Sequence, residues 1–256
     1  MGRSAGDMAL AAGASAAGSS FALSFVDEAG IQRREPLSSC WDVPFERMNP
    51  SRSFPSFKGQ RNFPGLWWSA TTGEHVGYES WLERDVAMLL DFDPEVVGFA
   101  AQPFWLLWPG ERGERRHVPD FFTRRKDGTG VVVDVRPDHL VDPKTTTVFE
   151  ATATACRQAG WRFHHTGGPP TVLAANMRWL SGYRHPRCHR PQIADALLER
   201  FAEPMPLLPG AETVGDRLAV LPVLYHLLWR HALVTDVSAA PLSPSSLVCQ
   251  AKAAAR

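Results

Sequence analysis

Two aspartates lie in sequence contexts that favour metal chemistry. Asp120 follows a proline at the start of one apolar segment, and Asp134 interrupts the valine run 131–135. A carboxylate inside a valine strand is costly to bury unless a cation pairs with it. The glycine-containing turn 126–130 between the two segments predicts a β-hairpin with a buried second strand. Such a hairpin would bring the two carboxylates side by side, which suits a divalent metal with oxygen ligands.

Arg136 is the third residue of interest in this segment. It follows Asp134 by two positions, so in a strand the two side chains project from the same face. Each aspartate also has an ordinary structural interpretation. Asp120, coming after a proline, has the sequence context of a turn or cap residue. For Asp134, the structural alternative is a salt bridge to Arg136 or Arg116.

An acidic helix precedes these aspartates. Residues 79–90 carry apolar side chains at helical spacing, and the segment ends where Pro94 disfavours helical geometry in the residue before it. Glu79 and Glu83 are four positions apart and are expected to share one face of this helix. Taken alone, both glutamates would be solvent-facing charges. The downstream aspartates make either one a candidate for the same site.

The order of the predicted elements indicates an α/β fold with a mixed sheet. After residue 170 the pattern changes to helices followed by a small β-ribbon, which is typical of a winged-helix module. The expected strands of the first part are 67–70, 96–100, 104–108, the two arms of the hairpin and 161–165, and its helices are 79–90 and 145–159. The second part is expected to contain helices 172–183, 193–201 and 220–230, a proline-rich break at 204–209, and strands 233–237 and 246–248.

Composition limits the possible partners and compartments. The 27 basic and 27 acidic residues cancel, so a polyanion partner would have to bind a local patch. The four cysteines form no CxxC pair, and no apolar run reaches about 18 residues. We therefore expect a cytoplasmic protein with no membrane partner. The expected divisions are a disordered tail 1–20, an arm 21–66, an α/β domain 67–170, a helical domain 171–248 and a tail 249–256.

Several of these motifs, in this order, resemble a known family. An acidic helix, Pro119-Asp120 and Asp134-Val135-Arg136 resemble the core of PD-(D/E)xK nucleases. The fuller set is similar to TnsA-type endonuclease subunits of heteromeric transposases, and the resemblance covers roughly residues 67–248. The segments that carry it are 79–85, 91–97, 102–104, 118–121 and, in the C-terminal part, 227–230 with Leu233 and Asp236.

The resemblance implies a restriction-endonuclease-like domain, a winged-helix-like domain and Mg²⁺-dependent DNA cleavage at a transposon end, with Mn²⁺ as a substitute metal. Its implied partners are double-stranded DNA and an integrase-type transposase subunit. Carried over by position, Asp120 is the metal-binding aspartate and Asp134 the acidic residue of the second motif. Glu83 is the helix glutamate, with Glu79 as the alternative, and Arg136 stands at the lysine position.

Arg136 is the departure from the family pattern. An arginine stays protonated and is no general base, although its guanidinium can hold a phosphate bidentately. Two other functions therefore stay open beside the transposase endonuclease. One is a catalytically weak DNA-binding or assembly adaptor for a partner transposase. The other is a stand-alone defence or repair nuclease.

Overall fold

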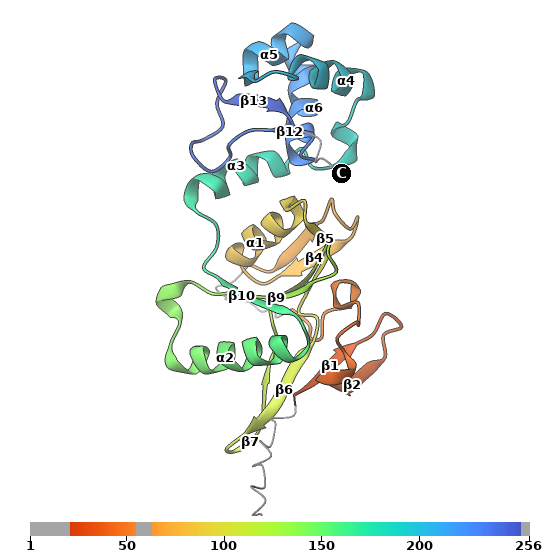
Figure 1. The fold of residues 1–256 in the computed structure, drawn as a ribbon, viewed down its shortest axis with the longest axis vertical. Helices are drawn as coiled ribbons and strands as arrows, with labels where there is room; N and C mark the ends of the chain where they lie inside the picture. The colour runs from red at the N-terminus through yellow and green to blue at the C-terminus, as the bar shows by residue number, and fades with distance from the viewer. Residues whose placement is uncertain (1–20, 55–62, 252–256) are drawn as a thin grey trace, which may run out of the picture.

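The computed structural model describes residues 21–54 and 63–251. The expected disordered tail 1–20 lies outside these ranges, as do residues 55–62 and 252–256. The fold is mixed α/β, as the sequence predicts, with helices and several small sheets stacked along one long axis (Figure 1). No helix in the described part of the chain has both the length and the apolar character needed to cross a bilayer.

A mixed four-stranded sheet forms the centre of the molecule. Its order is β10-β9-β8-β5, antiparallel from β5 to β9 and parallel between β9 and β10. The parallel pair needs a crossover connection, which α2 provides. The expected turn joins β8 to β9, and Gly128 adopts the left-handed backbone conformation there. The elements are β5 (Val96–Ala101), β8 (Phe121–Arg125), β9 (Gly130–Val135), α2 (Pro143–Gln158) and β10 (Arg162–Thr166).

A second, antiparallel sheet has the order β2-β1-β6-β7. It joins the N-terminal strands to a hairpin that the chain inserts between β5 and β8. Strands from the expected arm and from the expected α/β domain therefore share one sheet. Its members are β1 (Ala22–Val26), β2 (Gln32–Pro36), β6 (Trp105–Gly110) and β7 (Gly113–His117), with short 3₁₀ turns at η1 (Leu37–Ser39), η2 (Phe45–Arg47) and, after β9, η3 (Asp138–Leu140).

Helix α1 begins two residues later than the sequence predicts. It spans Trp81–Phe92, and Ser80 is its N-cap. A small hairpin, β3 (Gly65–Trp68) with β4 (His75–Tyr78), precedes it. Glu79 is therefore outside the helix, and the expectation that Glu79 and Glu83 share a helical face is wrong. The Ser80 side chain accepts from a backbone N–H of the first turn, which starts the helix after Glu79.

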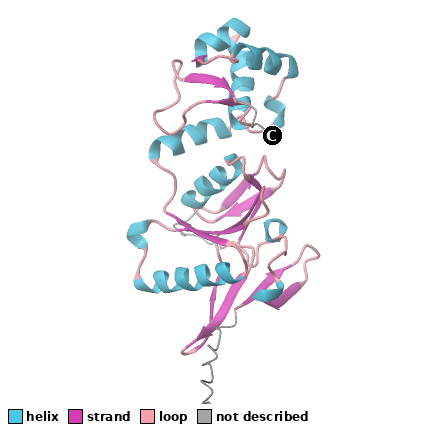
Figure 2. Ribbon diagram, viewed as in Figure 1, coloured by secondary structure: helices cyan, strands magenta, loops and turns pink. Residues whose placement is uncertain are grey.

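The C-terminal part is mostly helical, with a small three-stranded sheet of order β11-β13-β12 (Figure 2). The expected break at 204–209 instead holds β11 and the start of α5. Proline is tolerated in the first turn of a helix, so Pro209 does not interrupt α5. Strand β13 also extends into the expected tail. The elements are α3 (Thr171–Ser181), η4 (Pro186–Cys188), α4 (Pro191–Arg200), β11 (Met205–Pro206), α5 (Leu207–Val214), α6 (Arg217–Trp229), β12 (Leu233–Val234) and β13 (Leu247–Gln250).

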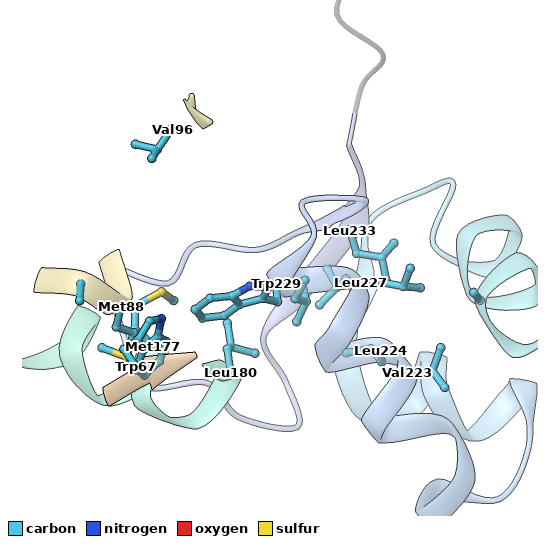
Figure 3. Close-up of a cluster of buried hydrophobic side chains, with 14 of the residues drawn as sticks. Trp67, Met88, Val96, Met177, Leu180, Val223, Leu224, Leu227, Trp229 and Leu233 are labelled. Carbon is cyan, nitrogen blue, oxygen red and sulfur yellow. The ribbon is translucent and has the colours of Figure 1, made fainter. Parts of the chain in front are cut away.

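One large hydrophobic cluster joins the two parts of the molecule. Figure 3 shows Trp229 of α6 beside Leu180 of α3, with Met177, Met88 of α1 and Trp67 of β3 further along the same cluster. Trp229 is buried, so α6 is a core helix. A second cluster lies between the two four-stranded sheets and α2, around Phe45, Phe104, Phe122 and Trp161. Packing on both sides holds the β8–β9 hairpin in place.

Candidate functional site

The β8–β9 hairpin brings Asp120 and Asp134 together. Phe121 pairs with Val133 in the register, so the residue before β8 lies beside Asp134. The Asp120 N–H points to Asp134 Oδ1 at 3.4 Å, and the Val135 N–H donates to Asp120 Oδ2 at 2.6 Å. The two carboxylates are therefore neighbours, held by backbone groups of the same hairpin.

Asp134 is buried, and its partner is a histidine. His117 Nε2, at the end of β7, lies 2.9 and 3.0 Å from the two carboxylate oxygens of Asp134. The sequence alternatives for this partner are wrong. Arg116 stacks on the ring of Trp105 at 4.6 Å, and Arg136 bonds elsewhere. His117 could not be predicted as this partner, because β7 belongs to the other sheet.

Arg136 follows the end of β9 and is exposed. Its Nε donates to the carbonyl of Leu140 at 2.8 Å, which holds the guanidinium against turn η3. Within the described ranges it forms no ion pair with Asp120 or Asp134. Arg136 nonetheless lines the same pocket as the two aspartates.

Glu83 sits in the first turn of α1 in a capping box. Its carboxylate accepts from the Glu79 N–H at 2.7 Å and from the Ser80 hydroxyl at 2.9 Å, and its own N–H donates to Ser80 at 3.2 Å. Glu79 directs its carboxylate to Arg52, with an N···O distance of 2.8 Å. The two glutamates thus differ in role. Glu79 has a cationic partner, whereas the donors to Glu83 among the described residues are neutral.

Negative charge at this site is poorly compensated. Burial, followed by the charges of Asp134, Glu83 and Glu79, raises the pKa of Asp120 well above its ordinary value. Burial is also the main cause that raises the pKa of Glu83. No arginine or lysine among the described residues pairs with Asp120. Removing this repulsion requires a proton or a bound cation.

The donor set fits a hard divalent cation. It consists of carboxylate oxygens, which Mg²⁺ prefers, and Mg²⁺ commonly binds one or two carboxylates while keeping several waters. Across the described residues, no three His, Cys, Asp or Glu side chains converge as a complete ligand set. Asp120 and Asp134 would therefore hold such an ion, with Glu83 as the further acidic group whose charge reaches Asp120.

An open pocket of about 360 Å³ lies next to the carboxylates. His117, Asp120 and Asp134 line one part of it, and Lys144 and Thr145 at the N-terminal end of α2 line another. Asp142, the N-cap of α2, also lines the pocket, and its carboxylate accepts from the Thr145 N–H at 2.8 Å. The pocket thus combines the carboxylate pair with two basic side chains, Lys144 and Arg136, and a third acidic residue. Sequence reasoning missed Lys144, because it lies ten residues after Asp134 in a helix that shows no motif.

Gln102 is a second residue whose place sequence reasoning left without a role. It is buried, it has a left-handed backbone with φ of 50°, and neither atom of its side-chain amide has a hydrogen-bond partner within the described ranges. Its N–H donates to the Asp120 carbonyl at 2.9 Å. Ser51, whose N–H donates to the Gln102 carbonyl, also has a buried hydroxyl with no hydrogen-bond partner in the part of the chain that the structure describes. Strained backbone and unpaired buried polar atoms concentrate at functional sites.

The substitution Glu83→Gln separates the role of this side chain in capping α1 from the effect of its negative charge. Glutamine still fits the capping box, so we expect the melting temperature to stay within about 2 °C of wild type. Loss of the charge is expected to weaken Mg²⁺ binding, measured by calorimetry, by at least about tenfold. Ser80→Ala is the matched control, and it should cost about 1 kcal/mol of stability. Unchanged Mg²⁺ affinity in a folded Glu83→Gln protein would remove Glu83 from the site.

Comparisons with known proteins identify no relative of this chain. No protein-family model matches this chain, and a search of curated proteins found no match to it.

Proposed function

We propose that this protein is a metal-dependent DNA endonuclease subunit of a heteromeric, TnsA-like transposase. The observation that carries the proposal is the Asp120–Asp134 pair, which the hairpin holds in a pocket also lined by Arg136 and Lys144 and whose charge no described arginine or lysine offsets. Two adjacent carboxylates with basic side chains in the same pocket suit a reaction on a phosphodiester.

The order of elements supports a restriction-endonuclease-like core. Helix α1, strands β5, β8 and β9, helix α2 and strand β10 follow each other as the resemblance implies, and they carry Glu83, Asp120 and Asp134 at the expected places. The arrangement of α4, α5 and α6 with the β11-β13-β12 sheet supports a winged-helix-like C-terminal domain. Such a domain suits binding of DNA or of the integrase-type partner subunit.

Each residue of the pocket has a role in this proposal. Asp120 and Asp134 would hold Mg²⁺, which supplies an activated water and electrostatic stabilisation of the charge that develops on the phosphoryl group. His117 orients Asp134 through its hydrogen bonds. Lys144 would bind the scissile phosphate. Arg136 would assist in phosphate binding once its guanidinium leaves the Leu140 carbonyl.

The role of Lys144 in phosphate binding can be tested by substitution. Replacing this exposed residue with methionine removes the charge but keeps the length of the side chain. We expect cleavage to fall by about 10- to 100-fold with no change in the melting temperature. Lys126→Met, in the exposed β8–β9 turn, is the matched control and should cleave normally. Equal activity in the two variants would exclude Lys144 from phosphate binding.

The experiment that tests the proposal is nicking of supercoiled DNA by the full chain. Mg²⁺ or Mn²⁺ is titrated with and without candidate integrase-type partners, and metal binding is measured by calorimetry. We expect metal-dependent nicking that increases when a partner is present. Nicking that is complete without any partner would instead favour the stand-alone nuclease. Metal-independent DNA binding without cleavage under any condition would overturn the proposal.

One observation favours the adaptor as the second candidate. Arg136 stands at the lysine position, and its guanidinium is held by the Leu140 carbonyl rather than by the site carboxylates. A protein of this kind would bind DNA and the partner subunit without contributing a cut. Its signature in the same experiment is DNA binding that recruits the partner while the partner alone cleaves.

A further inference from the structure

Although the net charge of the chain is zero, one segment of it is strongly basic. Residues 151–194 contain six arginines and no aspartate or glutamate. Two of these arginines have internal partners, since Arg178 pairs with Asp85 and Arg184 lies over the ring of Trp67 at 4.0 Å. The others lie at the surface. The positive charge of this segment is therefore not neutralised by acidic residues of the same segment.

Part of this segment forms one surface with the end of α6. We define the basic patch as His185, Arg187, His189, Arg190 and Arg230, all of which are exposed. Turn η4 packs against α6, where the His189 ring lies 5.7 Å from the ring of His226.

The positive charge of this patch affects the pKa of His226, which lies beneath it. The buried His226 has a lowered pKa, first because of burial and further because of the positive charges of His189, Arg230 and His185. Its ring is anchored to the Tyr183 carbonyl at 2.8 Å, so it stays in place beneath the patch. Burial lowers the pKa of Arg184; the charge of Asp91 opposes this shift, and the smaller contribution of the Arg187 charge adds to it. The patch is thus a region of positive potential.

Among the described residues, nothing occupies the arginine side chains of the patch. Within the described ranges, the guanidinium groups of Arg187, Arg190 and Arg230 take part in no ion pair and donate no hydrogen bond. The loop itself is fixed, because His185 stacks on Trp68 with ring centroids 4.7 Å apart and Arg184 donates to the Trp68 carbonyl. A fixed loop that presents unpaired arginines suits a backbone of regularly spaced phosphates.

The patch also lies within reach of the carboxylate site. Arg184, next to it, is 4.0 Å from Asp91 near the C-terminal end of α1, whereas Glu83 is in the first turn of the same helix. The eight-residue step from Glu83 to Asp91 corresponds to roughly 12 Å of helix, which is less than one turn of duplex DNA. One duplex could therefore contact both regions.

From these observations we infer that the basic patch binds the phosphate backbone of duplex DNA and holds it for the carboxylate site. The inference rests on the proposed function for its choice of DNA among polyanions. It assigns DNA contact to the turn between α3 and α4 and to the end of α6. Backbone contacts of this kind position a duplex without reading its sequence.

The test measures binding of a fluorescently labelled 30-base-pair duplex to the full chain in EDTA. Fluorescence anisotropy reports the binding at several salt concentrations. The double substitution Arg187→Ala/Arg190→Ala is expected to weaken binding about tenfold at low salt. It should also reduce the slope of log affinity against log salt by about 2, because each lost phosphate contact contributes about 0.9. Arg187→Lys/Arg190→Lys keeps the charge and should retain binding to within about threefold.

The matched control is Arg112→Ala/Arg115→Ala in the β6–β7 hairpin, which removes the same charge at the opposite end of the molecule (Figure 1). We expect it to bind within about twofold of wild type. Equal weakening in the two double variants, or none in the patch variant, would overturn the inference. Stronger competition by poly-glutamate than by unlabelled DNA would also overturn it and point to an acidic protein.

This outcome is separable from that of the proposed function. If the patch variant loses DNA binding as expected but the wild type never nicks DNA, only the endonuclease proposal fails. If the wild type nicks DNA and the patch variant binds and cuts normally, only the present inference fails. Melting temperatures of all variants show whether a loss of binding reflects unfolding.

Discussion

Asp120→Asn is expected to abolish metal-dependent cleavage, by at least about a thousandfold, and to raise the melting temperature of the metal-free protein. Asparagine can still accept the hydrogen bond from the Val135 N–H, so the hairpin should keep its geometry. The substitution removes a half-buried carboxylate that lies near Asp134 and Glu83 and has no cationic partner among the described residues. Activity and stability should therefore change in opposite directions.

The stability effect has a definite pH dependence. The unfolded chain releases the Asp120 proton near its ordinary pKa of about 3.9, whereas the folded chain holds it to higher pH because the folded pKa is raised. The folded state then binds more protons, so its stability falls as pH rises from about 4 through the folded pKa. Glu83 contributes with the same sign. Metal binding to the ionised carboxylates should reverse the trend.

Thermal unfolding in EDTA and in Mg²⁺ between pH 5 and pH 8 measures both effects. We expect the melting temperature of Asp120→Asn to exceed that of wild type in EDTA by about 3 °C or more at the upper end of this range. Mg²⁺ should stabilise wild type and not the variant. Asp195→Asn, an exposed aspartate on α4, is the matched control. An inactive Asp120→Asn protein that is less stable than wild type in EDTA would indicate a structural role instead.

Among the substitutions proposed here, Asp91→Ala is expected to cause the largest loss of stability. The Asp91 carboxylate accepts four hydrogen bonds: from Trp67 Nε1 at 3.0 Å, the Ser69 hydroxyl at 2.9 Å, the Ala70 N–H at 3.0 Å and the Thr71 N–H at 2.8 Å. Its side chain has no exposed surface. Alanine would leave these donors without an acceptor, two of them in buried side chains. We expect a loss of about 4 kcal/mol, or roughly 12 °C in melting temperature.

The same substitution should weaken the contact between the two parts of the molecule. Arg184, which lies 4.0 Å from Asp91, connects the end of α3 to the turn after β3. Chemical denaturation measures the loss, and Asp91→Asn, which keeps one acceptor oxygen, should fall between alanine and wild type. Asp195→Ala should change stability by less than about 0.5 kcal/mol. An Asp91→Ala protein as stable as this control would contradict the role of the network.

The sequence by itself determined the local parts of the candidate site. The alternation of apolar and turn residues was sufficient to predict the hairpin, because backbone pairing across a short turn depends on neighbouring residues. The hairpin in turn made Asp120 and Asp134 neighbours. The mixed α/β fold and most helices followed from periodicity in the same way. The start of α1 was missed by two residues, because the capping box of Ser80 and Glu83 decides it rather than apolar spacing.

Only the tertiary structure decided what surrounds that pair. His117 reaches Asp134 from β7, Lys144 faces the pocket from α2, and Gln102 meets Asp120 from the end of β5. None of these contacts is fixed by sequence spacing, since each depends on how separate strands and helices pack. The partner of Arg136 likewise depended on turn η3. Side chains that meet through packing rather than through a shared turn or strand leave no periodic signal in the sequence.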